Sequence, residues 1–159
     1  MLLLVHKTSL RKVIEKLAGF YINKRHVIFL QGPLGAGKTT FARAWLRALG
    51  VDENIPSPSY AIVQTYQNRQ GGVWHHFDCY RLRGAEDLLN MGIEDYLHDS
   101  ILCEWPEHGM DEIMQPDISI ELAFSEEEDV RVCKVIIGND QDNKQVRSLL
   151  DAYIKKDQQ

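Results

Sequence analysis

The sequence of 159 residues predicts one α/β domain over residues 1–159, a three-layer sandwich with helices on both faces of a mixed, mainly parallel sheet. Three observations predict this fold. A short apolar run over 26–31 enters a glycine-rich loop that leads directly into a helical segment. A second apolar run over 100–104 fits another buried strand, and two pairs of β-rich segments fit antiparallel hairpins.

The chain begins with a predicted helix and strand. Apolar residues recur at helical spacing behind Thr8 or Ser9, and we expect one of these two residues to cap a helix over 9–23. The apolar run over 26–31 ends in Gly-Pro, which is typical of a buried strand that enters a loop.

A second helix and the first hairpin follow. We expect a helix over 38–49 that ends at Gly50, because glycine readily adopts the backbone conformation that terminates a helix. The β-rich segments over 60–66 and 73–78 flank a polar, glycine-containing loop and predict a hairpin.

The second half of the chain again contains both helical and β-rich segments. A short helix is expected over 85–91, ended by Gly92, before the strand over 100–104. The segments over 117–124 and 130–137 enclose an acidic turn and predict a second hairpin. A helix is expected to close the chain over 143–153.

The composition is that of a globular protein, with 44% hydrophobic and 26% charged residues. Cys79, Cys103 and Cys133 lie far apart without a Cys-x-x-Cys pair, which argues against a disulfide framework or a thiolate zinc site. No run of about 18 apolar residues is present, so we expect no membrane association and a cytoplasmic location. A transit peptide over 7–25 is the alternative, but Glu15 favours a helix of the mature domain.

Charge is unevenly distributed along the chain. Residues 1–50 carry nine basic and one acidic side chain, whereas residues 51–159 carry nine basic and 22 acidic side chains. The total of −5 argues against strong, independent binding to a nucleic-acid backbone. The basic N-terminal part is suited to an acidic partner.

The segment Gly32-Pro-Leu-Gly-Ala-Gly-Lys-Thr39 fits the P-loop motif and lies between a predicted strand and a predicted helix, as the motif requires. Backbone amides of such a loop form an anion nest at the positive end of the helix. Lys38 then reaches the β- and γ-phosphates, and the Thr39 hydroxyl ligates Mg²⁺. The residues expected to bind the nucleotide here are Gly32, Leu34, Gly35, Ala36, Gly37, Lys38, Thr39 and Thr40.

A P-loop also requires an acid at the end of a neighbouring strand. Glu104 and Asp78 each close a predicted strand. We assign Glu104 to the metal together with Thr39, and Asp78 to the attacking water, although the two roles are interchangeable at this level. With Lys38, these two acids are the predicted catalytic residues.

Two further polar groups near these acids are of interest. His75 and His76 point to opposite faces of a strand and cannot share a metal, whereas His76 and Asp78 share a face and can pair. Ser59 lies in a Pro-braced loop about 20 residues after the P-loop, where a γ-phosphate-sensing switch is expected. A simple Pro-braced turn is the alternative for this loop.

Several motifs, in order and spacing, resemble the TsaE (YjeE) family, the bacterial P-loop ATPases of tRNA threonylcarbamoyladenosine biosynthesis. The matching segments are Gly32–Phe41, Ser57–Tyr60, His76–Leu82, Met91–Tyr96 and Glu104–Pro106. Ser59 stands where the family often has Thr, and Pro33 where an acid is common; neither change removes a group that the site requires.

The resemblance implies a P-loop fold, binding of ATP and Mg²⁺, and slow hydrolysis of ATP. It also implies docking onto the partner proteins TsaD and TsaB, with TsaD carrying out the transfer to tRNA and the tRNA contacting this subunit only indirectly. By the same likeness Lys38 and Thr39 act on phosphate and metal, Glu104 is the Walker-B-like acid, and Trp105 lies near the nucleotide.

Other functions share some of these features. A small-molecule kinase uses the same P-loop but needs an arginine-bearing lid, for which Arg81 and Arg83 are the available pair. A GTPase is disfavoured because Asn143-Lys-Gln-Val146 lacks the aspartate that would read guanine. A nucleotide-gated scaffold without useful turnover is the third alternative.

Overall fold

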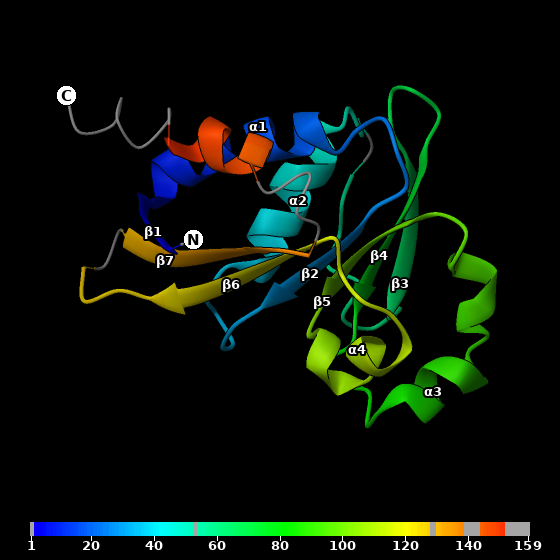
Figure 1. The fold of residues 1–159 in the computed structure, drawn as a ribbon. Helices are drawn as coiled ribbons and strands as arrows, with labels where there is room; N and C mark the ends of the chain where they lie inside the picture. The colour runs from blue at the N-terminus through cyan, green and yellow to red at the C-terminus, as the bar shows by residue number, and fades with distance from the viewer. Residues whose placement is uncertain (1, 53, 128–129, 139–143, 152–159) are drawn as a thin grey trace.

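The computed structural model describes residues 2–52, 54–127, 130–138 and 144–151, and its centre is a seven-stranded mixed sheet (Figure 1). The strand order is β1-β7-β6-β2-β5-β4-β3. The strands are β1 (Leu2–His6), β2 (Val27–Gln31), β3 (Val63–Gln67), β4 (Val73–Asp78), β5 (Ser100–Glu104), β6 (Ile118–Phe124) and β7 (Val130–Ile137).

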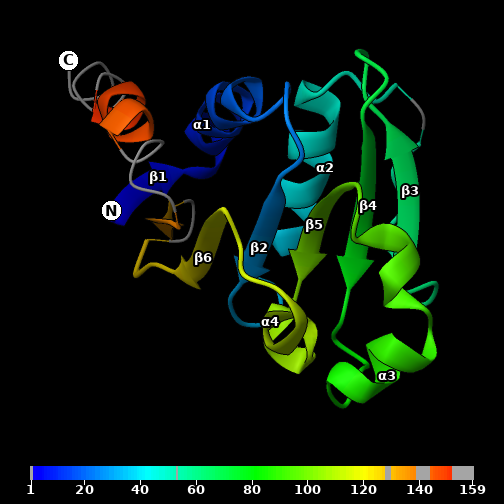
Figure 2. The same cartoon turned by 45° about the vertical axis from the view of Figure 1, so that its right-hand side comes forward.

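The four central strands, β6, β2, β5 and β4, are parallel, and antiparallel strands flank them on both sides. The carboxyl ends of β2, β4 and β5 therefore reach the same edge of the sheet (Figure 2). This edge receives the glycine-rich loop after β2 and the two acids that close β4 and β5.

Helices cover both faces of the sheet, which makes the fold a three-layer α/β sandwich. The helices are α1 (Lys7–Phe20), α2 (Lys38–Ala48), α3 (Ala85–Asn90), α4 (Met110–Ile113), a helix over 144–151, and the short 3₁₀ helices η1 (Ile93–Tyr96) and η2 (Pro106–His108). Buried side chains of α1 and α2 form one core with the sheet, and those of α3, η1 and α4 form a second core on the other face.

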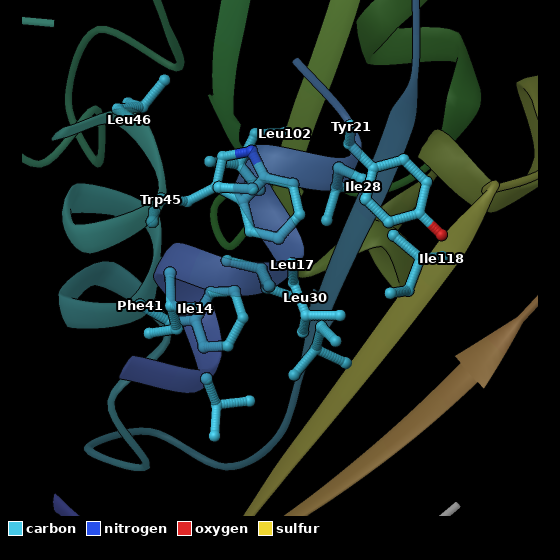
Figure 3. Close-up of a cluster of buried hydrophobic side chains, with 14 of the residues drawn as sticks. Ile14, Leu17, Tyr21, Ile28, Leu30, Phe41, Trp45, Leu46, Leu102 and Ile118 are labelled. Atoms are coloured by element: carbon cyan, nitrogen blue, oxygen red, sulfur yellow. The ribbon is translucent and has the colours of Figure 1, made fainter. Parts of the chain in front are cut away.

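The larger core fixes α2, and thus the loop before it, against the sheet. Trp45 and Phe41 of α2 point toward Ile14 and Leu17 of α1 and toward Leu30 of β2 (Figure 3). These side chains are almost completely buried. Burial of a large apolar side chain contributes about 1.5–3 kcal/mol, so this packing stabilises the position of α2.

Most predicted elements are confirmed, and the strands over 100–104 and 130–137 have the predicted bounds. The closing helix, predicted over 143–153, is described over 144–151, and the rest of the prediction lies outside the described residues. Strand β1 was not predicted, because its apolar run is very short and its partner, β7, lies about 130 residues away. No helix among the described residues is long and apolar enough to span a bilayer.

Two local predictions are wrong. Helix α1 begins at Lys7, so Thr8 lies inside its first turn and does not precede the helix. The strand predicted over 60–66 begins only at Val63, because residues 58–61 form a turn that is closed by a hydrogen bond from the Ile62 amide to the Pro58 carbonyl. Ile62 has a φ of 67°, a conformation that is unusual for a β-branched residue and breaks the strand at this point.

Candidate active site

The glycine-rich loop passes very close to strand β6 before it enters α2. A Cβ atom on Gly32, whose φ is 136°, would lie 2.1 Å from the carbonyl oxygen of Leu122. Only glycine fits this approach. At the other end of the loop, Gly37 precedes α2 with a φ of 107°, and no side chain caps the first amides of the helix. These amides and the positive end of the helix dipole form a site suited to an anion.

The Lys38 ammonium group lies inside the curve of this loop, and the residue is only 4% exposed. Its Nζ donates to the carbonyl oxygens of Gly32 at 2.6 Å and Pro33 at 2.9 Å, and lies 3.9 Å from the centre of the Trp105 ring. Burial lowers the pKa of Lys38, although nearby carboxylates, Glu104 foremost, favour the charged form. The cation is thus held inside the curve of the loop by two carbonyl oxygens and the face of an indole ring.

Glu104 connects three elements of the site. It ends β5, is 1% exposed, and its Oε2 accepts a hydrogen bond of 2.8 Å from the Thr39 hydroxyl at the start of α2. Its other oxygen, Oε1, lies 2.8 Å from Nε2 of His76 on β4. Both carboxylate oxygens are therefore hydrogen-bonded, which makes a buried charge at this position tolerable.

Asp78 lies beside Glu104 in the sheet but has different partners. The two residues are direct neighbours in the parallel register of β4 and β5. Oδ2 of Asp78 accepts a bond of 2.8 Å from the Ser59 hydroxyl, and Oδ1 accepts one of 3.0 Å from the Tyr80 amide. The pairing of His76 with Asp78 that we predicted is wrong, because the Asp78 oxygens are occupied in this way and the longer Glu104 side chain reaches the ring.

Most of the predicted site residues line one cleft of about 270 Å³ at the carboxyl edge of the sheet. The cleft is lined by Leu34, Gly35, Gly37, Lys38, Thr39, Thr40, Ser59, Asp78, Tyr80, Glu104 and Trp105. Of the predicted residues, Ala36 and Gly32 do not line it: Ala36 is buried, and Gly32 contributes its carbonyl oxygen to Lys38. Tyr80 was not predicted, although its position two residues after Asp78 was a usable signal.

Aromatic rings form the open side of this cleft. Tyr80 and Trp105 lie with ring centres 4.9 Å apart, and Tyr80 is 46% exposed. Trp105 has a φ of 57°, so the backbone after Glu104 turns sharply and directs the ring toward Lys38. The cleft therefore combines an apolar wall with charged and hydroxyl groups at its base.

The two arginines considered for a lid do not reach the cleft. The Arg81 guanidinium lies 4.1 Å from the centre of the Tyr60 ring, which is almost fully exposed. Arg83 pairs with Asp87 at 3.2 Å on the surface of α3. An arginine-bearing lid over the cleft is therefore not formed by these residues.

The donor groups of the cleft fit a magnesium nucleotide. Mg²⁺ prefers oxygen ligands, often one or two from the protein with the rest from water and phosphate. Thr39 and Glu104 place a hydroxyl and a carboxylate oxygen 2.8 Å apart beside the anion nest. No cluster of three or more His, Cys, Asp or Glu side chains that could hold a metal occurs in the part of the chain that the structure describes.

A comparison with protein families decides the identity of the chain. Residues 4–133 match the family described as "Threonylcarbamoyl adenosine biosynthesis protein TsaE". The chain belongs to the TsaE family. This confirms the resemblance that the motifs predicted, and it assigns the chain to tRNA threonylcarbamoyladenosine biosynthesis.

Individual TsaE proteins are similar over most of the chain. The TsaE protein of Haemophilus influenzae is 38% identical over 116 residues, which are 72% of this chain and 73% of that protein. The TsaE protein of Bacillus subtilis is 30% identical over 133 residues, 80% of each chain. The crystal structure of YdiB from the same species aligns with a TM-score of 0.64 at 21% identity, covering 99% of this chain and 97% of YdiB, and confirms the fold.

Proposed function

We propose that this TsaE chain binds ATP with Mg²⁺ in the cleft and hydrolyses it to ADP and phosphate, in support of the TsaD–TsaB pair that modifies tRNA. The observation that carries the proposal is the bond of 2.8 Å between Thr39 of the P-loop and the buried Glu104. A P-loop hydroxyl and a strand-end carboxylate at this spacing are the pair that a nucleotide-bound Mg²⁺ requires.

The loop and Lys38 bind the triphosphate. The free amides at the start of α2 receive phosphate oxygens, and Lys38 exchanges the carbonyl oxygens of Gly32 and Pro33 for those of the β- and γ-phosphates. Because the ammonium group is already desolvated, its interaction with phosphate is stronger than in water.

Thr39 and Glu104 would hold the metal, and His76 orients the carboxylate through its second oxygen. When bound, Mg²⁺ neutralises charge on the phosphates during transfer of the phosphoryl group. Asp78 is the second acid of the cleft. Its hydrogen bond from Ser59 breaks when the Asp78 carboxylate binds and orients the attacking water. Oxygen of that water bonds to the γ-phosphorus, the bond to the ADP oxygen breaks, and the water proton leaves toward Asp78.

Ser59 is the proposed sensor of the γ-phosphate. It lies in the turn over 58–61, and its hydroxyl is also 2.7 Å from Ser57. A shift of this hydroxyl from Asp78 to metal or phosphate would move the exposed Tyr60 at the protein surface. This links the nucleotide state to a surface that TsaD and TsaB can recognise, while the transfer to tRNA belongs to TsaD.

The kinase alternative receives no support from the cleft. The lid of a kinase supplies arginine to the transferred phosphoryl group and excludes water. Arg81 and Arg83 are engaged with Tyr60 and Asp87, outside the cleft. Because neither arginine covers the cleft, the proposal favours water over a small-molecule acceptor.

The test measures release of phosphate from ATP, with and without Mg²⁺ and with and without purified TsaD and TsaB. Lys38→Ala and Glu104→Gln are expected to reduce Mg²⁺-dependent turnover by about 100-fold or more, because each removes a charge that acts on the phosphates or metal. Lys134→Ala, which removes a surface cation paired with Glu121 on β6, is the matched control and keeps full turnover. Normal turnover of both cleft variants would contradict the proposal.

A further inference from the structure

Two cysteine side chains lie in contact beneath the strand ends that carry the acids of the cleft. Sγ of Cys79 and Sγ of Cys103 are 3.5 Å apart, and both residues are completely buried. The cysteines are 24 residues apart in the chain, but the parallel pairing of β4 with β5 brings them together. Both thiols are free in the structure. We call Cys79 and Cys103 the thiol pair.

The thiol pair is directly joined to the two acids in the sequence but lies on the other face of the sheet. Cys79 follows Asp78, and Cys103 precedes Glu104. The acids line the cleft, whereas the thiols pack with Phe77 in the second core, because successive residues of a strand point to opposite faces. A change at the sulfurs therefore reaches the acids through the adjoining backbone.

The main chain of Glu104 holds the two cysteines close to each other. Its carbonyl oxygen accepts the Cys79 amide at 3.0 Å and the Cys103 thiol at 3.5 Å. A disulfide requires the sulfurs to approach from 3.5 Å to about 2.05 Å. The pair is thus in contact but needs a small backbone movement to form the bond.

The backbone holds Cys103 more firmly than Cys79. Cys103 lies within β5, between the parallel strands β2 and β4. Cys79 lies just after β4, and the next side chain, Tyr80, is 46% exposed. In the closed structure burial protects both sulfurs. Local opening after β4 breaks the hydrogen bonds of the Cys79 backbone to Glu104 and Leu82, and exposes the Cys79 sulfur first.

We propose that a peroxide oxidises the thiol pair to a reversible disulfide, and that this bond slows ATP hydrolysis. The effect on hydrolysis rests on the proposed function, whereas formation of the disulfide does not. A disulfide that forms only under oxidation has a regulatory role. It differs from the structural disulfide framework that the cysteine spacing argues against.

The oxidation takes place in two steps and consumes one peroxide. The Cys79 sulfur attacks one oxygen of hydrogen peroxide, the O–O bond breaks, and water leaves with the thiol proton, so that a sulfenic acid remains. The Cys103 sulfur then attacks the Cys79 sulfur, the S–O bond breaks, and a second water leaves with the Cys103 proton. Two thiols are thereby oxidised to one disulfide while the peroxide is reduced to two waters.

The disulfide moves Asp78 more than Glu104. Because Cys103 is held between two strands, Cys79 makes most of the approach, and the adjoining Asp78 moves with it. The hydrogen bonds that orient Asp78, from the Ser59 hydroxyl at 2.8 Å and the Tyr80 amide at 3.0 Å, are then disturbed. A misplacement of about 1 Å at a reacting group lowers a rate by about 10- to 100-fold. The P-loop lies on other elements, so ATP binding is retained.

The test treats the reduced protein with hydrogen peroxide, blocks the remaining thiols with N-ethylmaleimide, and maps disulfides by mass spectrometry of peptides. The expected product is a single link between Cys79 and Cys103, with a mass lower by two hydrogen atoms. Mg²⁺-dependent phosphate release from the same samples is expected to fall about 10- to 100-fold and to recover with dithiothreitol. Calorimetric titration with a non-hydrolysable ATP analogue is expected to give the same affinity before and after oxidation.

Three alanine variants assign the effect to the thiol pair. Cys79→Ala and Cys103→Ala each remove one sulfur, so both are expected to keep phosphate release after treatment with peroxide. Cys133→Ala is the matched control, because Cys133 is also completely buried but lies in the larger core on the other face. This control is expected to form the link and lose turnover as the unaltered protein does.

The peptide map and the turnover each give a result that would overturn the proposal. Peroxide that leaves Cys79 and Cys103 unlinked, or that oxidises either one to a sulfinic acid without a link, would do so. A link with unchanged turnover would also overturn it, as would equal loss of turnover in Cys79→Ala and the unaltered protein. A reduced protein that releases no phosphate would instead contradict the proposed function, and the peptide map would still decide whether the disulfide forms.

Discussion

At the scale of single residues, Glu104 is the residue on which the candidate site depends most. It is almost fully buried, and its two oxygens face Thr39 and His76. The sequence identified both strand-end acids but left their roles interchangeable. In the structure Glu104 contacts the P-loop hydroxyl while Asp78 contacts Ser59, and for this reason Glu104 is the acid that we propose as the metal ligand.

His76→Ala tests whether the ring orients Glu104. Nδ1 of His76 has no hydrogen-bond partner in the described structure, so the contact of Nε2 with Oε1 of Glu104 is the one through which the ring can orient the carboxylate. Removal of this contact is expected to reduce the free energy of unfolding by about 1.5–3 kcal/mol, and to raise the Mg²⁺ concentration required for half-maximal ATP turnover.

Urea denaturation and a Mg²⁺ titration measure these two effects. His75→Ala is the matched control, since His75 contacts Thr65 at 2.8 Å and Asp99 at 3.1 Å and no residue of the cleft. It is expected to lower stability without changing the Mg²⁺ requirement. Equal Mg²⁺ requirements in both variants would show that His76 has only a structural role.

At the scale of elements, the site depends on how closely β2, its loop and β6 approach one another. The parallel register aligns Gln31 of β2 with Glu121 of β6, and the chain then turns at Gly32 beneath the Leu122 carbonyl. A side chain at Gly32 would separate the loop from the sheet. The P-loop glycine at this position is therefore required for packing as well as for the phosphate nest.

Gly32→Ala is expected to reduce the free energy of unfolding by about 1–3 kcal/mol and to weaken ATP binding, because it combines a steric clash with a strained φ. Gly19→Ala in α1 is the control: no atom lies within 4 Å of its added Cβ, and its φ is not positive. That variant gains about 0.5–1 kcal/mol from helix propensity. Thermal unfolding and calorimetric titration with ATP separate the two effects, and equal stability of both variants would refute the packing argument.

At the scale of the whole molecule, buried or partly buried carboxylates lie at both edges of the parallel strands. The acids Asp78 and Glu104 lie at the carboxyl edge, where the Lys38 ammonium group opposes their negative charge. At the start of β6, Asp117 accepts a bond of 2.7 Å from the Val27 amide and lies 3.6 Å from Nδ1 of His26. This carboxylate connects the beginnings of β2 and β6.

The lowered pKa of Asp117 predicts that the stability of the fold decreases at acid pH. Burial raises its pKa, but the neighbouring His26 side chain and the hydrogen bond from the Val27 amide outweigh burial and hold the pKa below its ordinary value. A lowered pKa in the folded state stabilises the protein above the ordinary carboxyl pKa of about 3.9, and this stabilisation is lost as pH falls through the folded value. The effect is partial because the side chain is 38% exposed.

Asp117→Asn is therefore expected to flatten the dependence of stability on pH below about pH 4, while it lowers stability at neutral pH. Urea midpoints measured between pH 2.5 and 7 test this expectation. Asp111→Asn, at an exposed position of α4, is the control for the loss of one carboxylate outside this contact. Parallel pH profiles for Asp117→Asn and the unaltered chain would contradict the assignment.

The sequence by itself determined the P-loop over 32–39, the buried strand over 100–104 and the two acids, because each is encoded by a local pattern of glycine, apolar runs or strand ends. Only the tertiary structure decided that His76 faces Glu104 and that Arg69 reaches the end of α2. These contacts join residues that are distant in the chain. Their geometry follows from sheet register and packing, which no local window of sequence specifies.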